Sequence, residues 1–240
     1  MRLLALLTLA AAPALAQTDG RGFYRQPAIH GDTIVFCAEG DQWTVPVSGG
    51  TAQRLTTHPA IENHPVISPD GRTVAFTARY EGPTEVYTMP LAGGVPTRRT
   101  YEGEASVVTA WAPSGALVYA TTHDSTLPDL QLVALDLATQ SRRPLPLSQA
   151  SEGSFDASGK TLYFVRPAFH NNVTRRYRGG TARKLWKFAE GSAEAVCLSC
   201  DYTGESHSPQ WWNGRVYFVS DRDGTLPRQV VPLPGAAVAR

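Results

Sequence analysis

The side chains most suited to chemistry in this sequence are a cysteine pair, six scattered histidines, an acidic turn and a basic cluster. Cys197 and Cys200 form a C-x-x-C motif, a spacing found in redox pairs, zinc sites and short disulfides. No βαβ pattern surrounds the motif, and no two further zinc ligands can be placed. Three interpretations stay open: plain thiols on a strand, a local disulfide, or a metal or redox site. Cys37 lies in a β-rich segment and is predicted to be a core residue.

The histidines form no recognisable catalytic arrangement. They are His30, His58, His64, His123, His170 and His207. None belongs to an H-E-x-x-H or H-x-E pattern, and the chain has no Gly-x-Ser-x-Gly elbow. Most fall in predicted turns or strand ends, where a solvated histidine is the ordinary outcome. We therefore assign no catalytic residue.

The run Asp221-Arg222-Asp223-Gly224 looks like the opening of a calcium-binding EF-hand loop. Such a loop ends in a bidentate glutamate at its twelfth position, and the residue at that place is Pro232. The pattern therefore predicts a β-turn and excludes calcium binding of this kind. With no other ligand set in the sequence, we assign no metal-binding and no cofactor-binding residue.

One basic cluster interrupts an otherwise balanced charge distribution. It comprises Arg175, Arg176, Arg178, Arg183, Lys184 and Lys187, interleaved with Tyr177 and Trp186. Interleaved cations and aromatics suit nucleic acid, but the formal net charge of the chain is only +1. We expect a solvated insertion on the rim of the fold and no nucleic-acid partner. The remaining interpretation is contact with another domain or with a carboxylate on a peptide.

The first sixteen residues have the pattern of a secretory signal peptide. Arg2 supplies a positive charge, an apolar stretch runs to Leu15, and Ala14-Leu15-Ala16 gives a small-x-small cleavage pattern. The apolar stretch is too short for a comfortable membrane span, although an N-terminal anchor helix is the alternative. We expect residues 1–16 to be removed, leaving a periplasmic or secreted chain without a membrane span.

A strand signature recurs through the rest of the chain. Each copy ends in an aromatic residue, at Phe36, Phe76, Tyr119, Phe164 and Phe218, giving intervals of 40, 43, 45 and 54 residues. A period in the forties with several short strands per unit is typical of the blades of a β-propeller. Trp43, Tyr87 and Trp186 recur at matched places in the following strand, as expected of blade-to-blade packing in the core.

The repeats predict an all-β fold, an incomplete β-propeller of four-stranded antiparallel blades. We place blades at about 22–60, 61–104, 105–149 and 150–205, and half a blade at 206–225, within a propeller region of 17–225. An irregular tail follows at 226–240, where prolines fit a central strand poorly. The abrupt change at Leu226 leads us to expect an artificial terminus, as a shifted reading frame gives. An arc this incomplete leaves blade flanks uncovered, which predicts self-association.

Several segments resemble bacterial tricorn protease homologues. They are Gly22 to Asp32, Gly50 to Thr56, Tyr177 to Trp186 and Trp211 to Thr225. The turn Ser68-Pro69-Asp70-Gly71 is shared more broadly with TolB-like and other WD40-like (PD40) propellers, including those of prolyl-oligopeptidase relatives. The resemblance covers roughly residues 22–225 and implies the N-terminal six-bladed propeller of that family.

The resemblance also implies a setting in which this region would work. Family members continue into a second propeller, a PDZ-like module and a tail-specific (S41) peptidase core, where a serine and a histidine carry peptide hydrolysis. No segment here resembles those domains, so no catalytic residue is carried over. The chain is then expected to be a non-catalytic propeller fragment of a serine peptidase, acting in peptide gating or scaffolding, with the downstream protease domains as partners. The alternative is a free-standing periplasmic TolB-like propeller that binds peptides or proteins.

Overall fold

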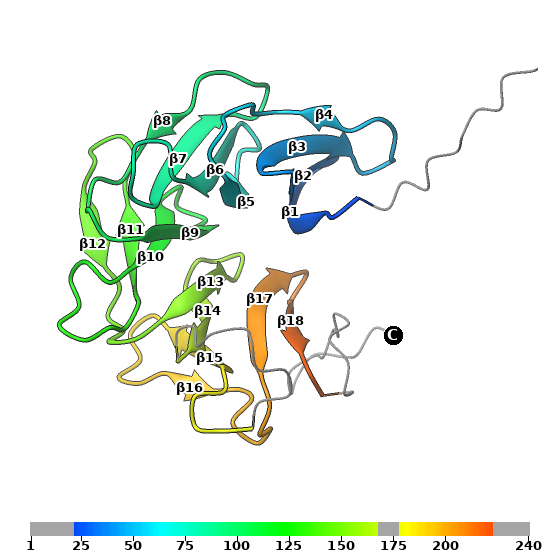
Figure 1. Ribbon diagram of the computed structural model, residues 1–240. Coiled ribbons are helices and arrows are strands. Elements are labelled where there is room, and N and C mark those ends of the chain that lie inside the picture. The colour runs from blue at the N-terminus through cyan, green and yellow to red at the C-terminus, as the bar shows by residue number, and fades with distance from the viewer. Residues whose placement is uncertain (1–21, 168–177, 223–240) are drawn as a thin grey trace, which may run out of the picture.

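The computed structural model describes residues 22–167 and 178–222, and the regular structure in these segments is entirely β (Figure 1). Four sheets of four strands and one sheet of two strands follow one another along the chain. They fan around a central axis in a propeller arrangement, which confirms the predicted fold class. We call the sheets blades 1 to 5 in chain order.

Each of the first four blades is an antiparallel meander from an inner to an outer strand. Blade 1 contains β1 (Arg25–His30), β2 (Thr33–Ala38), β3 (Asp41–Pro46) and β4 (Gln53–Arg54). Blade 2 contains β5 (Glu62–Ile67), β6 (Thr73–Ala78), β7 (Glu85–Pro90) and β8 (Thr97–Arg98). Blade 3 contains β9 (Ser106–Trp111), β10 (Leu117–Thr121), β11 (Gln131–Leu135) and β12 (Arg142–Pro144). Blade 4 contains β13 (Ser151–Phe155), β14 (Thr161–Arg166), β15 (Lys184–Ala189) and β16 (Val196–Cys197). Blade 5 contains β17 (Ser206–Trp212) and β18 (Arg215–Ser220).

The core lies between the blades, and the alternation of strand residues builds it. Because successive side chains of a strand point to opposite faces, each second strand buries side chains against both neighbouring blades. In blade 3, Leu117 and Tyr119 pack with Ala75 of blade 2, whereas Val118 packs with blade 4. We call the face toward the preceding blade face A and the face toward the next blade face B.

Face A carries the repeated aromatic residue in every blade. In blade 2 it holds Val74, Phe76, Tyr87 and Met89, which cluster with Val35 from face B of blade 1. The substantial contacts between described elements join each blade only to its neighbours in sequence. Blades 1 and 5 therefore end the arc, and each has one face without a neighbouring blade among the described residues.

In three blades, a buried hydroxyl that follows the fourth strand accepts a hydrogen bond from a backbone N–H of the third strand. Thr56 Oγ1 accepts the N–H of Gln42, Thr100 Oγ1 that of Val86, and Ser199 Oγ that of Leu185, each bond spanning 14 residues. The hydroxyl satisfies a buried backbone donor that would otherwise be costly to bury. Two of these hydroxyls also donate to fully buried carboxylates of blade 2, Thr56 to Glu62 and Thr100 to Glu85.

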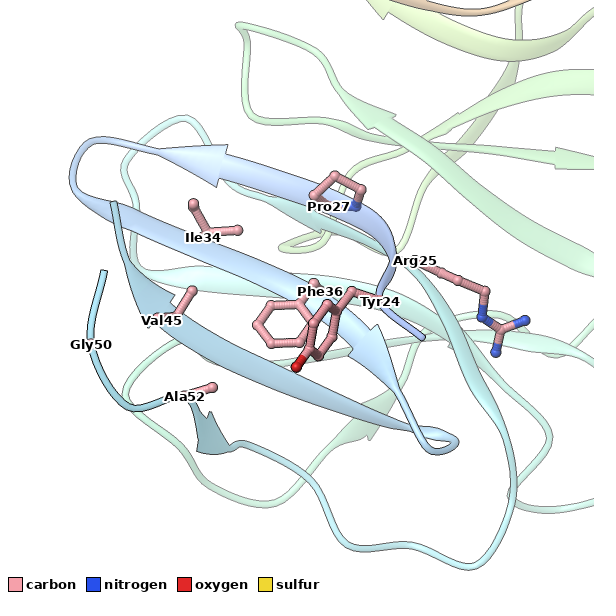
Figure 2. A pocket seen from close by; sticks show the side chains of 8 residues that line it. All are labelled: Tyr24, Arg25, Pro27, Ile34, Phe36, Val45, Gly50 and Ala52. Atoms are coloured by element: carbon pink, nitrogen blue, oxygen red, sulfur yellow. The ribbon is translucent and has the colours of Figure 1, made fainter. Parts of the chain in front are cut away.

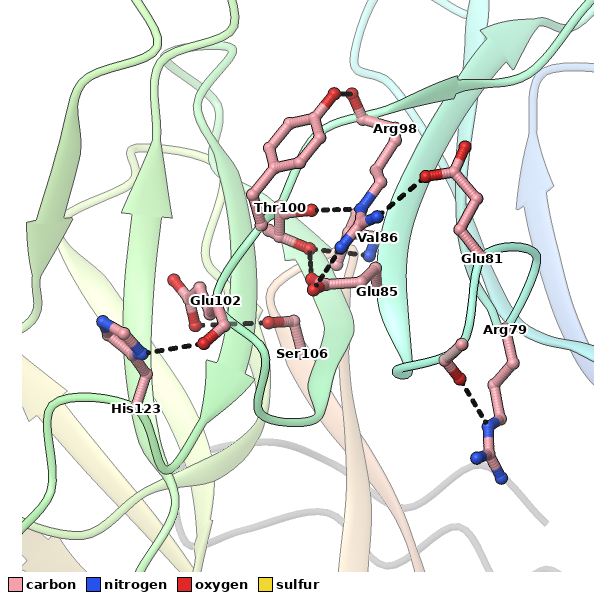
Figure 3. A network of polar contacts seen from close by, with 11 residues as sticks. Arg79, Glu81, Glu85, Val86, Arg98, Thr100, Glu102, Ser106 and His123 are labelled. Atoms are coloured by element: carbon pink, nitrogen blue, oxygen red, sulfur yellow. Dashed lines mark hydrogen bonds and ion pairs between the residues drawn. The ribbon is translucent and has the colours of Figure 1, made fainter.

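The two carboxylates differ in their other partners. Glu62 accepts hydrogen bonds from the hydroxyl of Tyr80 and the N–H of Gln42. Glu85 instead forms an ion pair with Arg98, at 2.8 Å between Oε1 and Nη2 (Figure 3). Arg98 also pairs with the exposed Glu81 at 2.8 Å. Blade 2 thus holds one buried carboxylate among neutral donors, at the start of β5, and another beside a cation, at the start of β7.

Some sequence predictions fall outside the described residues. These are the signal peptide at 1–16, the tail at 226–240, most of the insertion with Arg175, Arg176 and His170, and the turn residues Asp223 and Gly224. Within the described segments no helix has the length and apolarity needed to cross a bilayer.

Candidate functional site

A β-bulge interrupts the pairing of every described inner strand with its neighbour. In four blades the first bulged residue has a positive φ, at Gln26 (51°), His64 (53°), Glu152 (48°) and Ser208 (54°). A proline or glycine follows each of them, so the irregularity costs few ladder hydrogen bonds. Bulges re-aim side chains, and here they lie on the strands that surround the axis (Figure 1). We call these four residues the axial ring.

The side chains of the axial ring join neighbouring blades. The N–H of His64 donates to Gln26 Oε1 at 2.9 Å, and the two side-chain nitrogens lie 3.1 Å apart. In the same way the N–H of Ser208 donates to Glu152 Oε2. A bulged residue in one blade therefore holds the backbone of the bulged residue in the next blade. This device serves the packing of the arc, and it also fixes polar groups beside the axis.

Two histidines of this region are held in the neutral form. Desolvation among the inner strands lowers the pKa of His64, with Glu152 opposing the shift and Arg25 adding to it. Burial likewise lowers the pKa of His207, and the charge of Arg183 acts in the same direction. A neutral imidazole has one donor and one acceptor nitrogen. The axis therefore presents groups suited to hydrogen bonding with a peptide backbone.

A serine and a histidine meet at the bulge of blade 5. His207 Nδ1 lies 3.0 Å from Ser208 Oγ. A catalytic pair needs a third group that orients the base and donors that stabilise an oxyanion. Among the described residues, no hydrogen bond links the other ring nitrogen of His207 to a carboxylate. Within the described segments, this pair is therefore a polar contact without an orienting partner.

The basic cluster does not form one solvated patch, which corrects that expectation for two of its members. Arg183 is buried and pairs with Glu152 at 3.3 Å and with Glu205 at 2.9 Å. Lys184 donates to the backbone oxygens of Tyr202 and Gly204, and burial lowers its pKa. Lys184 begins strand β15 and Arg183 directly precedes it, at the interface with blade 5, where interior carboxylates and carbonyls need cations. Lys187, farther along β15, is exposed.

The cysteine pair forms a local disulfide, one of the three interpretations left open by the sequence. The bond joins Cys197 to Cys200 and encloses Ser199, whose hydroxyl holds the N–H of Leu185. The disulfide therefore closes the turn that supplies the recurring hydroxyl in blade 4. Cys37 is a free, fully buried thiol, as predicted.

Thiol counting tests this assignment. Burial raises the pKa of Cys37 to about 11, so neither access nor ionisation favours its reaction with a thiol reagent at neutral pH. We expect no reactive thiol in the folded chain, one after denaturation without reductant, and three after reduction. A count of three in the denatured, unreduced chain would contradict the disulfide.

The remaining histidines do not join the axial ring. His30, His58 and His123 are exposed, and His58 packs on Tyr80 with ring centroids 4.0 Å apart. No cluster of three or more potential metal-ligating side chains occurs in the part of the chain that the structure describes. The axial ring is therefore the site best supported by the geometry.

The fold and the axial ring define a β-propeller module that presents polar groups at its axis. Comparison with known proteins makes the class specific. Residues 21–230 match the family model of the tricorn protease N-terminal β-propeller domain. The chain belongs to this family, as its sequence resemblance predicts.

Named relatives agree with that assignment. Tricorn protease homolog 1 of Streptomyces coelicolor is 34% identical over 214 residues, which are 88% of this chain and 20% of the relative. The tricorn protease of Thermoplasma acidophilum is 27% identical over 211 residues, 82% of this chain and 19% of the relative. The chain thus spans about a fifth of the length of these relatives.

Solved structures place the fold in the same group. The crystal structure of the tricorn protease superposes with a TM-score of 0.74 at 25% identity, over 85% of this chain and 20% of that chain. TolB from Acinetobacter baumannii superposes with a TM-score of 0.62 at 19% identity, over 83% of this chain and 52% of that chain. At that identity the second match describes the fold alone.

Proposed function

We propose that this chain is the N-terminal propeller part of a tricorn-type serine peptidase and that it binds and guides peptides without a catalytic step of its own. The observation that carries the proposal is the family match over residues 21–230, in a chain that spans about a fifth of its relatives. The activity would then reside in partner domains of the tail-specific peptidase type. The same proposal gives the chain a gating or scaffolding role in proteolysis outside the cytoplasm.

The axial ring supplies the chemistry for this role. Its bulged residues fix amide, imidazole and carboxylate groups on inner strands that the blades hold rigidly. The Gln26 amide donates to Nε2 of neutral His64, so the ring's Nδ1–H is the group that can pair with the C=O groups of a peptide. Recognition through backbone groups tolerates many sequences, as the guiding of mixed peptides requires.

Peptide binding by the purified chain tests the proposal. A pool of fluorescein-labelled decapeptides should raise its anisotropy on titration, and fluorogenic peptides should not be cleaved. The His64→Ala variant should bind about tenfold more weakly, the equivalent of about 1.4 kcal/mol. His30→Ala is the matched control, because His30 is an exposed histidine at the end of β1, outside the axial ring. Peptide cleavage, absence of binding, or equal binding by both variants would refute the proposal.

The second candidate is a free-standing exported propeller that binds a protein partner. Its support is the TolB-like fold and a relative of similar length. That relative, from Sulfurisphaera tokodaii, is named a putative Tricorn-like protease N-terminal subunit. It is 22% identical over 168 residues, which are 84% of its length. Reading the encoding DNA onward in all frames separates the two candidates. Further blades and a peptidase core support the first, and a clean intergenic region supports the second.

A further inference from the structure

Face A of blade 1 is an apolar sheet face without a neighbouring blade among the described residues. Figure 2 shows its side chains: Ile34, Phe36 and Val45 project from β2 and β3, and Tyr24 lies over Phe36. The rings of Tyr24 and Phe36 meet edge to face, with centroids 5.3 Å apart. Together with neighbouring residues they line a groove of about 580 Å³.

The equivalent face is fully packed wherever a blade precedes it. Ile34 and Phe36 correspond to Val74 and Phe76 of blade 2, both of which are inaccessible to solvent. Ile34 is only half-buried, although it has the same place in its strand. Face A of blade 1 is therefore built as the inner side of a sheet-on-sheet interface, and burial of such a face is strongly favourable.

The same chain carries the complementary face at the other end of the arc. In blade 5, face B displays Tyr217 and Val219 on β18, and both side chains are half-buried. In blade 4, face B displays Tyr163 and Val165 at the equivalent places of β14. The two faces thus present the same two residue types in the same order.

The interface between blades 4 and 5 shows which side chains pack against such a face. Tyr163 of blade 4 packs in one cluster with Val216 and Phe218 on face A of blade 5. Face A of blade 1 offers an aliphatic residue and a phenylalanine at the same strand positions, Ile34 and Phe36. Among the described residues, the two ends of the arc therefore carry the two halves of an interface like that between blades 4 and 5.

We infer that face A of blade 1 docks face B of blade 5 from a second copy of this chain. The contact is head to tail, because the two faces differ, and it repeats the packing of blade 5 on blade 4. Head-to-tail contacts leave one face of each kind at the ends of any open assembly.

Complementary variants give a decisive test. Ile34→Asp places a charge on face A, and Tyr217→Asp places one on face B. Each variant alone should be monomeric by light scattering at concentrations where the wild-type chain forms dimers and larger species. An equimolar mixture should form a dimer and nothing larger, because one intact face A then meets one intact face B. We expect each substitution to raise the dissociation constant at least tenfold.

Val95→Asp is the matched control, since Val95 is 85% exposed and lies away from both faces, in the turn that follows β7. It should associate like the wild-type chain, and circular dichroism should show the same fold in all variants. A wild-type chain that stays monomeric at every concentration overturns the inference. Dimers of Tyr217→Asp alone, or no dimer in the mixture, overturn it as well.

Discussion

Replacing Glu85 by glutamine is expected to lower the free energy of unfolding by about 3 kcal/mol, because it breaks a buried ion pair and leaves a cation behind. Glu85 is fully buried, and the Arg98 side chain with which it pairs is only 15% exposed. The second partner of Arg98, Glu81, is 64% exposed and compensates little, since solvent screens it. Chemical denaturation of the variant at neutral pH measures the loss.

Glu62→Gln is the matched control, and it is expected to leave stability within about 1 kcal/mol of the wild-type value. Glu62 is as deeply buried as Glu85 and holds the equivalent hydroxyl, but its partners are neutral. An amide oxygen can still accept from Thr56 and from the N–H of Gln42, and no cation loses its counter-charge. Equal losses in the two variants would show that the ion pair is not what distinguishes the two carboxylates.

The pH dependence of the control follows from the same burial. Desolvation raises the pKa of Glu62 above its ordinary value of 4.5. The folded state therefore holds this proton more tightly than the unfolded chain does, so Glu62 favours folding below pH 4.5. That contribution is lost as the pH rises through the folded-state pKa. Relative to wild type, Glu62→Gln should become more stable as the pH rises above about 4.5.

The strand repeats could be predicted because they depend on local alternation. In the triplet Leu117-Val118-Tyr119, the two outer residues face the preceding blade and the middle residue faces the next blade. The equivalent triplets follow the same alternation, and the aromatic residue at the end of each triplet marks the blade. Of the matched aromatics, Tyr87 and Trp186 pack against the neighbouring blade as predicted, whereas Trp43 lies half-buried on face A of blade 1. Trp43 pairs with Phe36, and Trp186 pairs with Phe164, directly across the second and third strands.

The axial ring was missed because its signal is faint. A polar residue before proline or glycine, as in Gln26-Pro27 and His64-Pro65, is the available cue, and each such residue adopts a positive φ inside a strand. Without the partner strand, this cue is indistinguishable from an ordinary turn. The burial of Arg183 was missed for a related reason. Its partners Glu152 and Glu205 lie 31 and 22 residues away, beyond any local pattern.

Leu117→Ala is expected to cost about 4 kcal/mol, whereas Ile34→Ala, at the same place in the repeat, should cost about 1 kcal/mol. Leu117 is inaccessible to solvent and packs between blades 2 and 3 with Ala75 and Val86. Its truncation therefore opens a cavity that rigid neighbours on two sheets cannot fill. Ile34 loses contacts on one sheet only, because no blade precedes face A of blade 1 in the segments that the structure describes.

Urea unfolding of both alanine variants, at a concentration where the chain is monomeric, measures this difference. A gap of about 3 kcal/mol means that the neighbouring blade, and not the strand position, decides what an apolar residue of the repeat contributes. Similar losses would mean that face A of blade 1 is already covered in the monomer, which would also remove the surface on which association depends. A small loss at Ile34 together with weaker association of that variant would assign this side chain to the interface between copies.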